Sequence, residues 1–336
     1  MALLIGCGAM MLTNERMAAA RERCVRQPDA VVATPCVHSR ALSGASGADV
    51  YLKYEHCQRT GSFKYRGALN KLRQLIEQQM APTIVAASSG NHGLAVATAA
   101  KVCGLSAIVY VPASADPAKQ RAIAAAGATL ITVEGDSLLA ELTARRAAED
   151  RDAVFVSPYN DIDVVAGQST IGSELLEQCP DADMVIAAVG GGGLLSGIGS
   201  AMRAGGSQAA FVGVWPAVAC SMYRCLQAGQ VINVAEAPTW SDGTAGGVEP
   251  GAVTLPILAD VLDEQWLVDE DRITAAMRWL AIHEHMIVEG SAALAVAPLL
   301  ERHPAVQGKR VIAVLCGRNI DYERFQTALQ QGATAA

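Results

Sequence analysis

Short runs rich in apolar and β-branched residues recur along most of this chain, and they constrain its fold more than any other feature. From about residue 50 onward they alternate with Ala- and Leu-rich segments of helical length, such as residues 93–103, 136–149 and 162–178. Strands that are apolar on both faces are typical of parallel sheets that helices cover on both sides. The sequence therefore predicts an α/β protein with mostly parallel sheets. The expected strands are residues 50–55, 83–89, 106–112, 128–134, 153–158, 184–190, 210–216 and 310–317.

The length and charge of the chain limit its organisation and its partners. With 336 residues, about half of them apolar and less than a fifth charged, the chain has room for two globular domains. No repeat or long linker separates two halves, so a second domain is expected to be inserted within the first. A net charge of -7 without any basic cluster excludes a nucleic-acid surface and favours a small-molecule partner.

Cysteine usage indicates a reducing compartment. The nine cysteines are scattered, odd in number and contain no CxxC pair, which argues against a disulfide framework or a zinc ribbon. Residues 1–11 are apolar but lack a basic leading segment, and they are too short to cross a bilayer. These features predict a cytoplasmic protein without a membrane partner.

Lys64 lies in the run Thr-Gly-Ser-Phe-Lys-Tyr-Arg-Gly-Ala at residues 60–68, which follows the first expected strand. Thr60 or Ser62 is a suitable N-cap for a helix that begins here, and Lys64 then falls in its first turn. The helix dipole disfavours a cation at that end. A neutral amine or an imine, as Schiff-base chemistry requires, avoids this cost. Taken alone, the segment favours the simpler interpretation, an exposed helical lysine.

Two further turns are suited to anions. Residues 88–93, Ser-Ser-Gly-Asn-His-Gly, close one expected strand and open a helix, where backbone N–H groups can hold a carboxylate. The alternative is a polar turn in which Ser89 or Asn91 only caps the helix. Residues 190–194, Gly-Gly-Gly-Gly-Leu, leave their amides unobstructed and favour a phosphate. The turn has neither a GxGxxG spacing with its downstream acid nor a GK[ST] ending, both of which are typical of nucleotide sites. Which ligand carries the phosphate stays open at this point.

Cys316 ends the last expected strand within Cys-Gly-Arg-Asn. A neutral thiol there is a weak donor that could meet a ring nitrogen. The plainer interpretation is a small buried apolar side chain.

Taken together and in this order, these segments resemble the fold-type II pyridoxal-phosphate enzymes, in particular the serine/threonine dehydratase (threonine ammonia-lyase) and serine racemase group. The resemblance covers about residues 40–321, nearly the whole chain, and rests on several separated motifs. The Ser-Phe-Lys-x-Arg-Gly-Ala run at 62–68 is similar to the lysine motif of the group, although Tyr65 stands where related threonine synthases usually have aspartate. The runs at 88–93, 190–194 and 241–244 and the Glu-Gly pair at 289–290 match further signatures.

The resemblance implies a fold and a set of roles. The fold is tryptophan synthase β-like, with two three-layer α/β/α domains: a large one of residues 1–81 and 158–336, and a small mobile one of residues 82–157 inserted in it. Lys64 carries pyridoxal 5'-phosphate as a Schiff base and removes the α-proton, and Ser89 matches the opposite-face acid/base of racemases. Cofactor binding falls to Phe63, Lys64, Asn91, Gly190, Gly191, Gly192, Gly193, Leu194, Gly243, Glu289 and Cys316. Substrate binding falls to Ser88, Ser89, Asn91 and His92.

Some positions depart from the pattern of the group. Cys316 stands where serine is usual, against the pyridine nitrogen. Because a thiol is a poor acid with a pKa of about 8.5, the nitrogen is expected to stay unprotonated, which favours expulsion of the β-hydroxyl over transamination. Trp215 and Ser221 stand where serine racemases and some dehydratases bind a divalent cation with acidic residues, so no such magnesium site is expected. Arg318 replaces a usual glycine.

The function implied is a dehydratase that converts L-threonine or L-serine, or a similar β-hydroxy amino acid, to a 2-oxo acid and ammonia. A near alternative is a dehydratase for 3-hydroxyaspartate or for an amino acid derived from hydroxyectoine, and another is a serine racemase. A non-catalytic ligand-binding relative is the alternative from a different class, and Lys64 with its two anion-binding turns argues against it. We expect a homodimer or homotetramer whose partner is a small amino acid.

Overall fold

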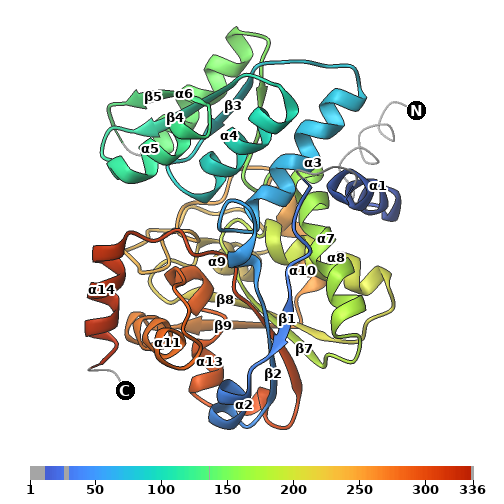
Figure 1. The fold of residues 1–336 in the computed structure, drawn as a ribbon, viewed down its shortest axis with the longest axis vertical. Coiled ribbons are helices and arrows are strands. Elements are labelled where there is room, and N and C mark those ends of the chain that lie inside the picture. Colours follow the sequence, from blue (N-terminus) through green and yellow to red (C-terminus); the bar gives the residue numbers. More distant parts are fainter. Residues whose placement is uncertain (1–11, 26–29, 136, 334–336) are drawn as a thin grey trace.

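The computed structural model describes residues 12–25, 30–135 and 137–333 (Figure 1). The apolar segment 1–11, with Cys7, and position 136 lie outside the described residues, so the interpretation of the N-terminal segment is not tested. The other eight cysteines are free thiols in the described part of the chain. No described helix combines the length and apolar character that crossing a bilayer requires.

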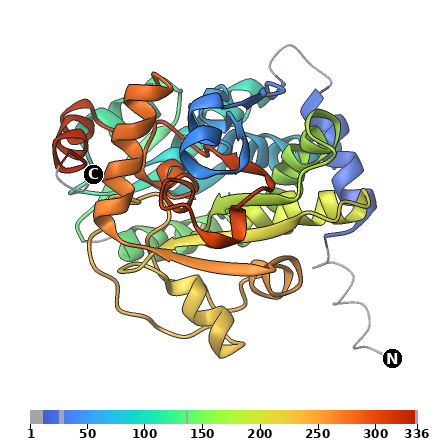
Figure 2. The same cartoon turned by 90° about the horizontal axis from the view of Figure 1, so that it is seen from below.

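The larger sheet has six strands among the described residues, in the order β1-β2-β10-β7-β8-β9. All neighbours pair in parallel except β1 with β2. Helices lie on both sides of this sheet (Figure 2). Its strands are β1 Cys36–His38, β2 Asp49–Lys53, β7 Met184–Ala188, β8 Ala210–Pro216, β9 Glu264–Val268 and β10 Arg310–Val314.

The smaller sheet has four parallel strands in the described part of the chain, in the order β5-β4-β3-β6. Its strands are β3 Ile84–Ala87, β4 Ala107–Pro112, β5 Thr129–Val133 and β6 Val154–Phe155. Both sheets are thus mainly parallel, which confirms the α/β fold class. The two strands that the sequence did not predict are edge strands: β1 is three residues long, and β9 mixes polar with apolar residues.

Helices connect nearly all of these strands. Figure 1 shows the smaller sheet with α4, α5 and α6 at one end of the molecule and the larger sheet at the other, with α3 between them. The α-helices are α1 Asn14–Val25, α2 Arg40–Ser46, α3 Lys64–Glu77, α4 Asn91–Cys103, α5 Pro117–Ala125, α6 Ser137–Asp150, α7 Ile162–Gln178, α8 Gly193–Ala204, α9 Ser221–Ala228, α10 Thr254–Val261, α11 Glu270–His283, α12 Gly290–Ala293, α13 Ala297–Leu300 and α14 Tyr322–Gln331, and the short 3-10 turns are η2 Glu55–Cys57 and η3 Pro304–Val306.

Helix α3 belongs by its packing to the core of the smaller sheet. Its buried Leu69 and Leu72 lie in one apolar cluster with Ile84 of β3 and Val96 of α4. A domain boundary between residues 81 and 82 stays a prediction, and the shared core shows that α3 makes close contact across it.

The start of α3 differs from the sequence prediction. The N-cap is Phe63, which makes no capping side-chain hydrogen bond within the described residues. Thr60 Oγ1 and Ser62 Oγ are buried and have no partner in that part of the chain, so neither caps the helix. The segment is held instead by the chain that follows β10: the N–H of Phe63 donates to the Cys316 carbonyl (3.1 Å) and Ser62 forms a β-bridge with Gly317. The pairing places Lys64 at the carboxyl end of β10.

A buried ion cluster ties α3 to its surroundings. The guanidinium of Arg66 donates to both carboxylate oxygens of Glu55 (2.8 and 2.7 Å) and to both of Glu174 on α7 (2.6 and 2.9 Å). Lys53 Nζ of β2 donates to the same Glu174 (2.6 Å). Arg66, Glu55 and Lys53 are fully buried. Burial by itself would raise the pKa of Glu55, but the attraction of Arg66 and its hydrogen bonds lower it. The cluster balances two cations against two carboxylates.

Replacing Arg66 by methionine should destabilise the fold by about 3–5 kcal/mol, because two carboxylates would lose their partner inside the protein. Urea unfolding followed by circular dichroism measures this free energy. Arg21→Met is the matched control, since the Arg21–Glu177 pair is more than half exposed on both sides and should change the free energy of unfolding by less than about 1 kcal/mol. Equal effects of the two substitutions would show that the buried cluster does not hold α3.

Candidate active site

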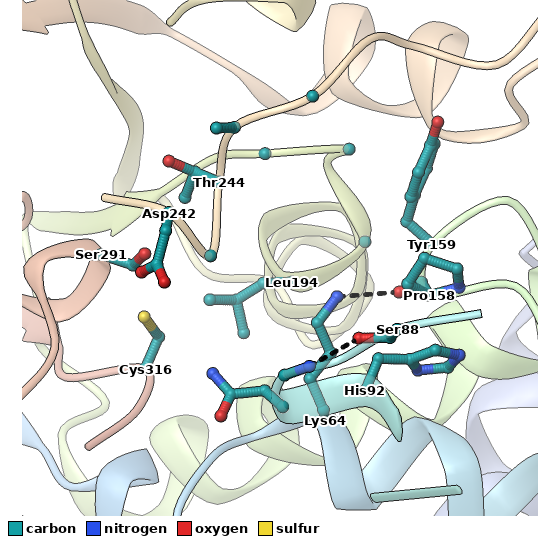
Figure 3. Close-up of a pocket in the computed structure, with 18 of the residues that line it drawn as sticks. Lys64, Ser88, His92, Pro158, Tyr159, Leu194, Asp242, Thr244, Ser291 and Cys316 are labelled. Atoms are coloured by element: carbon teal, nitrogen blue, oxygen red, sulfur yellow. Dashed lines mark hydrogen bonds between the residues drawn. The ribbon is translucent and has the colours of Figure 1, made fainter. Parts of the chain in front are cut away.

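A cavity of about 410 Å³ lies between the two sheets (Figure 3). Its walls come from segments that follow parallel strands: residues 88–92 after β3, 158–159 after β6, 190–194 after β7 and 316–319 after β10. The carboxyl ends of parallel strands are where open α/β sheets bind ligands. The start of α3, the loop at 242–247, and residues of α5, α6 and the start of α12 also line it.

Every residue that the sequence suggested for the site lines this one cavity: Phe63, Lys64, Ser88, Ser89, Asn91, His92, Gly190, Gly191, Gly192, Gly193, Leu194, Gly243, Glu289 and Cys316. The structure thus brings together residues that are up to about 250 positions apart in the sequence. Their individual roles in binding and catalysis stay predictions.

Lys64 is partly buried and its amine lies inside the cavity, which excludes the interpretation as an exposed helical lysine. Its Nζ donates to the Pro158 carbonyl (3.0 Å) and lies 5.1 Å from the centre of the Phe63 ring. Figure 3 shows Lys64 reaching toward Pro158, with Cys316 and Asp242 on the other side of the cavity. Burial lowers the pKa of Lys64 to about 8, against the opposing influence of Cys316 and Glu289. At pH 7 roughly a tenth of the amine is therefore neutral, compared with less than about a thousandth for a lysine of ordinary pKa.

The glycine turn at 190–193 leaves a small space, called the glycine cradle below, that a side chain on the turn would fill. A Cβ on Gly191 would come within 2.3 Å of the Tyr159 ring, and a Cβ on Gly190 within 2.9 Å of the Thr244 backbone. Gly192 has a φ of +90°, which favours glycine. Helix α8 begins at Gly193, so its first amides are directed at the cavity, and they suit a phosphate group.

The second turn opens α4 without a side-chain cap. The N-cap is Gly90, and Ser88 Oγ accepts from the Gly90 N–H (3.2 Å), so neither Ser89 nor Asn91 is the cap that the sequence allowed as an alternative. Ser89 and the N-terminal amides of a 13-residue helix are left facing the cavity. This arrangement suits a carboxylate.

His92 lies in the same turn and carries no charge near neutral pH. Burial, together with the charge of Lys64, lowers its pKa to about 3. Its Nε2 bonds the Val156 carbonyl (2.8 Å), and its Nδ1 has no partner among the described residues. A contribution of His92 to carboxylate binding would therefore rest on its main-chain N–H.

Glu289 and Cys316 form the wall opposite Lys64, and burial shifts the pKa of each toward the uncharged form. Burial raises the pKa of Glu289 to about 7, although hydrogen bonds from Asn91 act in the opposite direction. Burial and the charge of Glu289 raise the pKa of the Cys316 thiol well above its ordinary value. The Cys316 Sγ lies 4.0 Å from Glu289 Oε1. Cys316 is therefore a neutral thiol, as the sequence predicted.

Several lining residues were missed from the sequence. They are Lys119, Glu141, Tyr159, Asp242, Ser291 and Asn319. Lys119 of α5 and Glu141 of α6 look like solvated helix residues, and only the docking of the smaller sheet against the loop that carries Asp242 turns them inward. The Lys119–Asp242 pair bridges the two parts at 3.2 Å. Asn319 did have a signal, since it is a polar residue directly after a buried strand.

The described residues contain no group of three or more histidine, cysteine, aspartate or glutamate side chains placed to hold a metal ion. The expectation that the chain has no magnesium site stays a prediction.

Comparison with known proteins gives consistent results. A family model described as "Pyridoxal-phosphate dependent enzyme" matches residues 28–317. An L-threonine ammonia-lyase of Geobacter sulfurreducens is 37% identical over 90% of this chain and 75% of its own length. An L-threo-3-hydroxyaspartate ammonia-lyase of a Pseudomonas species is 34% identical over 88% of this chain and 93% of its own. The solved structure of maize serine racemase superposes with a TM-score of 0.86 at 28% identity, covering 95% of this chain and 97% of that one.

The glycine cradle leads to a test. Gly191→Ala should lower the thermal midpoint by several degrees, because its methyl group meets the Tyr159 ring at 2.3 Å, and it should weaken the binding of a phosphate-bearing ligand. Differential scanning calorimetry and equilibrium dialysis measure the two effects. Gly247→Ala is the control, since Gly247 also lines the cavity but has open space around it. An unchanged Gly191→Ala protein would rule out the cradle.

Proposed function

The chain belongs to the pyridoxal-phosphate dependent enzymes and is an ammonia-lyase of that family, and on this premise we propose that it converts L-threonine or L-serine to a 2-oxo acid and ammonia. The observation that carries the proposal is the position of the Lys64 amine. It lies in one cavity with a glycine turn suited to a phosphate and a helix N-terminus suited to a carboxylate.

The residues present fit the cofactor. The amides of residues 190–193 would hold its phosphate, in the cradle that a Cβ would fill. Lys64 would attach its aldehyde, and the neutral thiol of Cys316 would face its ring nitrogen. When bound, pyridoxal phosphate supplies an aldehyde that reacts with amines and a conjugated ring that withdraws electrons from the adjacent carbon.

The side chains of this site would divide the remaining work. The amides around Ser89 would fix the substrate carboxylate, and Lys64 Nζ, once free, would accept the proton from the substrate Cα. His92, with a pKa of about 3, is a weak base, and the Cys316 thiol stays protonated, so neither competes with the Lys64 amine for the substrate proton. Loss of the β-hydroxyl followed by hydrolysis then yields ammonia and the 2-oxo acid.

The charges of the cavity favour a substrate whose side chain is uncharged. Among the described residues, the cationic side chains that line the cavity are those of Lys64 and Lys119. Lys119 is paired with Asp242 (3.2 Å), and Glu141 also lines the cavity. A second carboxylate, as in 3-hydroxyaspartate, would have to displace Asp242 from Lys119, whereas the hydroxyl and methyl groups of serine or threonine need no cation.

Serine racemisation is the second candidate, because Ser89 lies in the cavity lining together with Lys64. A substrate derived from hydroxyectoine stays open for the same cavity. We further propose that residues 82–157 form a small domain that closes over the substrate, with Lys119 and Asp242 meeting across the gap, and that the enzyme is a cytoplasmic homo-oligomer.

The pKa of Lys64 predicts how cofactor uptake depends on pH. Only the neutral amine attacks an aldehyde, so below a pKa of about 8 the rate constant for covalent uptake by the apoenzyme should rise roughly tenfold per pH unit and level off at higher pH. Stopped-flow absorbance measures this rate. Lys64→Ala should retain no cofactor after borohydride reduction, while Lys101→Ala, an exposed lysine, should behave as the wild type. A plateau reached only near pH 10 would identify Lys64 as an ordinary lysine.

The substrate preference can be measured as 2-oxo acid release from L-threonine, L-serine and L-threo-3-hydroxyaspartate. We expect kcat/KM for the dicarboxylate to be about 100-fold below that for threonine, a difference of about 2.7 kcal/mol. Asp242→Asn should narrow this gap by freeing Lys119, whereas Asp260→Asn on an exposed face of α10 should not. Efficient turnover of the dicarboxylate by the wild type would contradict the assignment.

A further inference from the structure

Three polar side chains from separate parts of the chain form one hydrogen-bonded group beside the cavity. They are Asn91, the first residue of α4, Glu289, the N-cap of α12, and Asn319, which follows β10. Asn91 Nδ2 donates to both carboxylate oxygens of Glu289 (2.9 Å each). Asn319 Nδ2 donates to Asn91 Oδ1 (2.7 Å). The group joins α4 of the smaller sheet to two segments of the larger one.

The direction of these hydrogen bonds is set by a backbone carbonyl. Asn319 Nδ2 also donates to the Thr60 carbonyl (2.7 Å), which can only accept. The two protons of this NH2 group are thus used, one on Thr60 and one on Asn91. Asn91 must therefore present its oxygen to Asn319 and its NH2 group to the interior, where Glu289 accepts.

The backbone conformation beside Asn319 leaves space for its side chain. Gly61, next to Thr60, has a φ of +76°, and a Cβ there would lie 2.5 Å from Asn319 Oδ1. Glycine at this position leaves room for the amide of Asn319. The same chain segment leads directly into Lys64, so the Asn319 side chain connects the lysine-bearing turn with the N-terminus of α4.

We propose that Asn319 is a positioning residue that sets the orientation of the Asn91 amide and so keeps its NH2 group, which in this structure donates to Glu289, on the side of the cavity. The inference rests on the proposed function and on the cofactor contact that the family resemblance implies for Asn91. It adds to that contact the residue that decides which end of the amide faces inward. Without such a partner, an asparagine side chain can expose either its donor or its acceptor.

Replacing Asn319 by aspartate puts a hydrogen-bond acceptor, a carboxylate oxygen, where the Nδ2 donor was. The new carboxylate oxygen would face the oxygens of Thr60 and Asn91, and the Asn91 amide would turn to donate to it. Asn91 Oδ1 would then face Glu289 and the cavity, where an acceptor opposes an oxygen of the bound cofactor. The charged and titratable groups that face Glu289 are Cys316, Lys64, Asp242 and Lys119, and the main-chain N–H of residue 319 also bonds it. These groups stay the same in this variant, which adds one carboxylate at position 319.

The test uses the holoenzyme without substrate. Asn319→Asp should weaken pyridoxal phosphate binding by about tenfold or more, as expected for a lost hydrogen-bond donor to a charged oxygen, and should shift the absorption maximum of the bound cofactor. Asn319→Leu, which removes the donor without reversing its polarity, should give a smaller change. Asn233→Asp makes the same chemical change at an exposed position and should match the wild type.

A double-mutant cycle separates positioning from general support of the fold. In an Asn91→Ala background, Asn319→Asp should cause little further change in affinity or spectrum, because its effect passes through Asn91. Three results would each overturn the inference. The first is that Asn319→Asp changes cofactor affinity and spectrum in the Asn91→Ala background as much as in the wild type. The others are a wild-type spectrum and affinity in Asn319→Asp, and a larger loss of affinity in Asn319→Leu than in Asn319→Asp. Failure of the wild type to take up the cofactor would instead overturn the proposed function.

Discussion

The buried contact between Arg66 and its two carboxylate partners is the interaction on which the rest of the site depends. Arg66 follows Lys64 by two residues, and its bidentate bonds to Glu55 and Glu174 hold the first turn of α3 against η2 and α7. The pairing of Phe63 with the Cys316 carbonyl then fixes the direction in which the turn enters the helix. A lysine on an unanchored helix end would sample many positions. Here it has one.

Desolvation gives the cavity its chemical character. Burial moves the pKa of Lys64 down to about 8, that of His92 down to about 3 and that of Glu289 up to about 7. All three shifts favour the uncharged form, because a charge inside protein loses its hydration. The site therefore offers an amine that is more often neutral than an ordinary lysine, beside a histidine that carries no charge near neutral pH and a carboxyl group whose charge is reduced by burial. Anionic ligands are left to backbone amides at two helix N-termini, which need no charged side chain.

The two sheets contribute different parts of this site. The larger sheet supplies the lysine turn, the glycine cradle and the wall of Glu289 and Cys316, whereas the smaller sheet supplies the carboxylate turn. The contacts that meet across the cavity are polar: Asn91 bonds Glu289, and Lys119 bonds Asp242, whereas α3 packs against the smaller sheet through an apolar core. Polar contacts of this kind can be broken and remade at modest cost, unlike an apolar core, so they suit a cavity that has to admit and release small molecules.

The sequence by itself determined the α/β class and identified many of the residues that line the cavity, because buried strands and anion-binding turns leave local patterns in the composition. Buried parallel strands require continuous apolar runs, and an anion-binding turn requires glycine or small polar residues at a strand end, so the strands and the turns at 88–93 and 190–194 could be recognised. Lys64 was identified only by the family resemblance of several motifs taken together. Only the tertiary structure decided the start of α3, the edge strands β1 and β9, and the inward position of Lys119, Asp242 and Asn319. Thr60 and Ser62 are good caps by type, yet pairing with the chain after β10 places Phe63 at the cap instead. Asn319 acquires its partners from residues more than 200 positions away, and no local pattern specifies a hydrogen bond between segments that meet only when both sheets are folded.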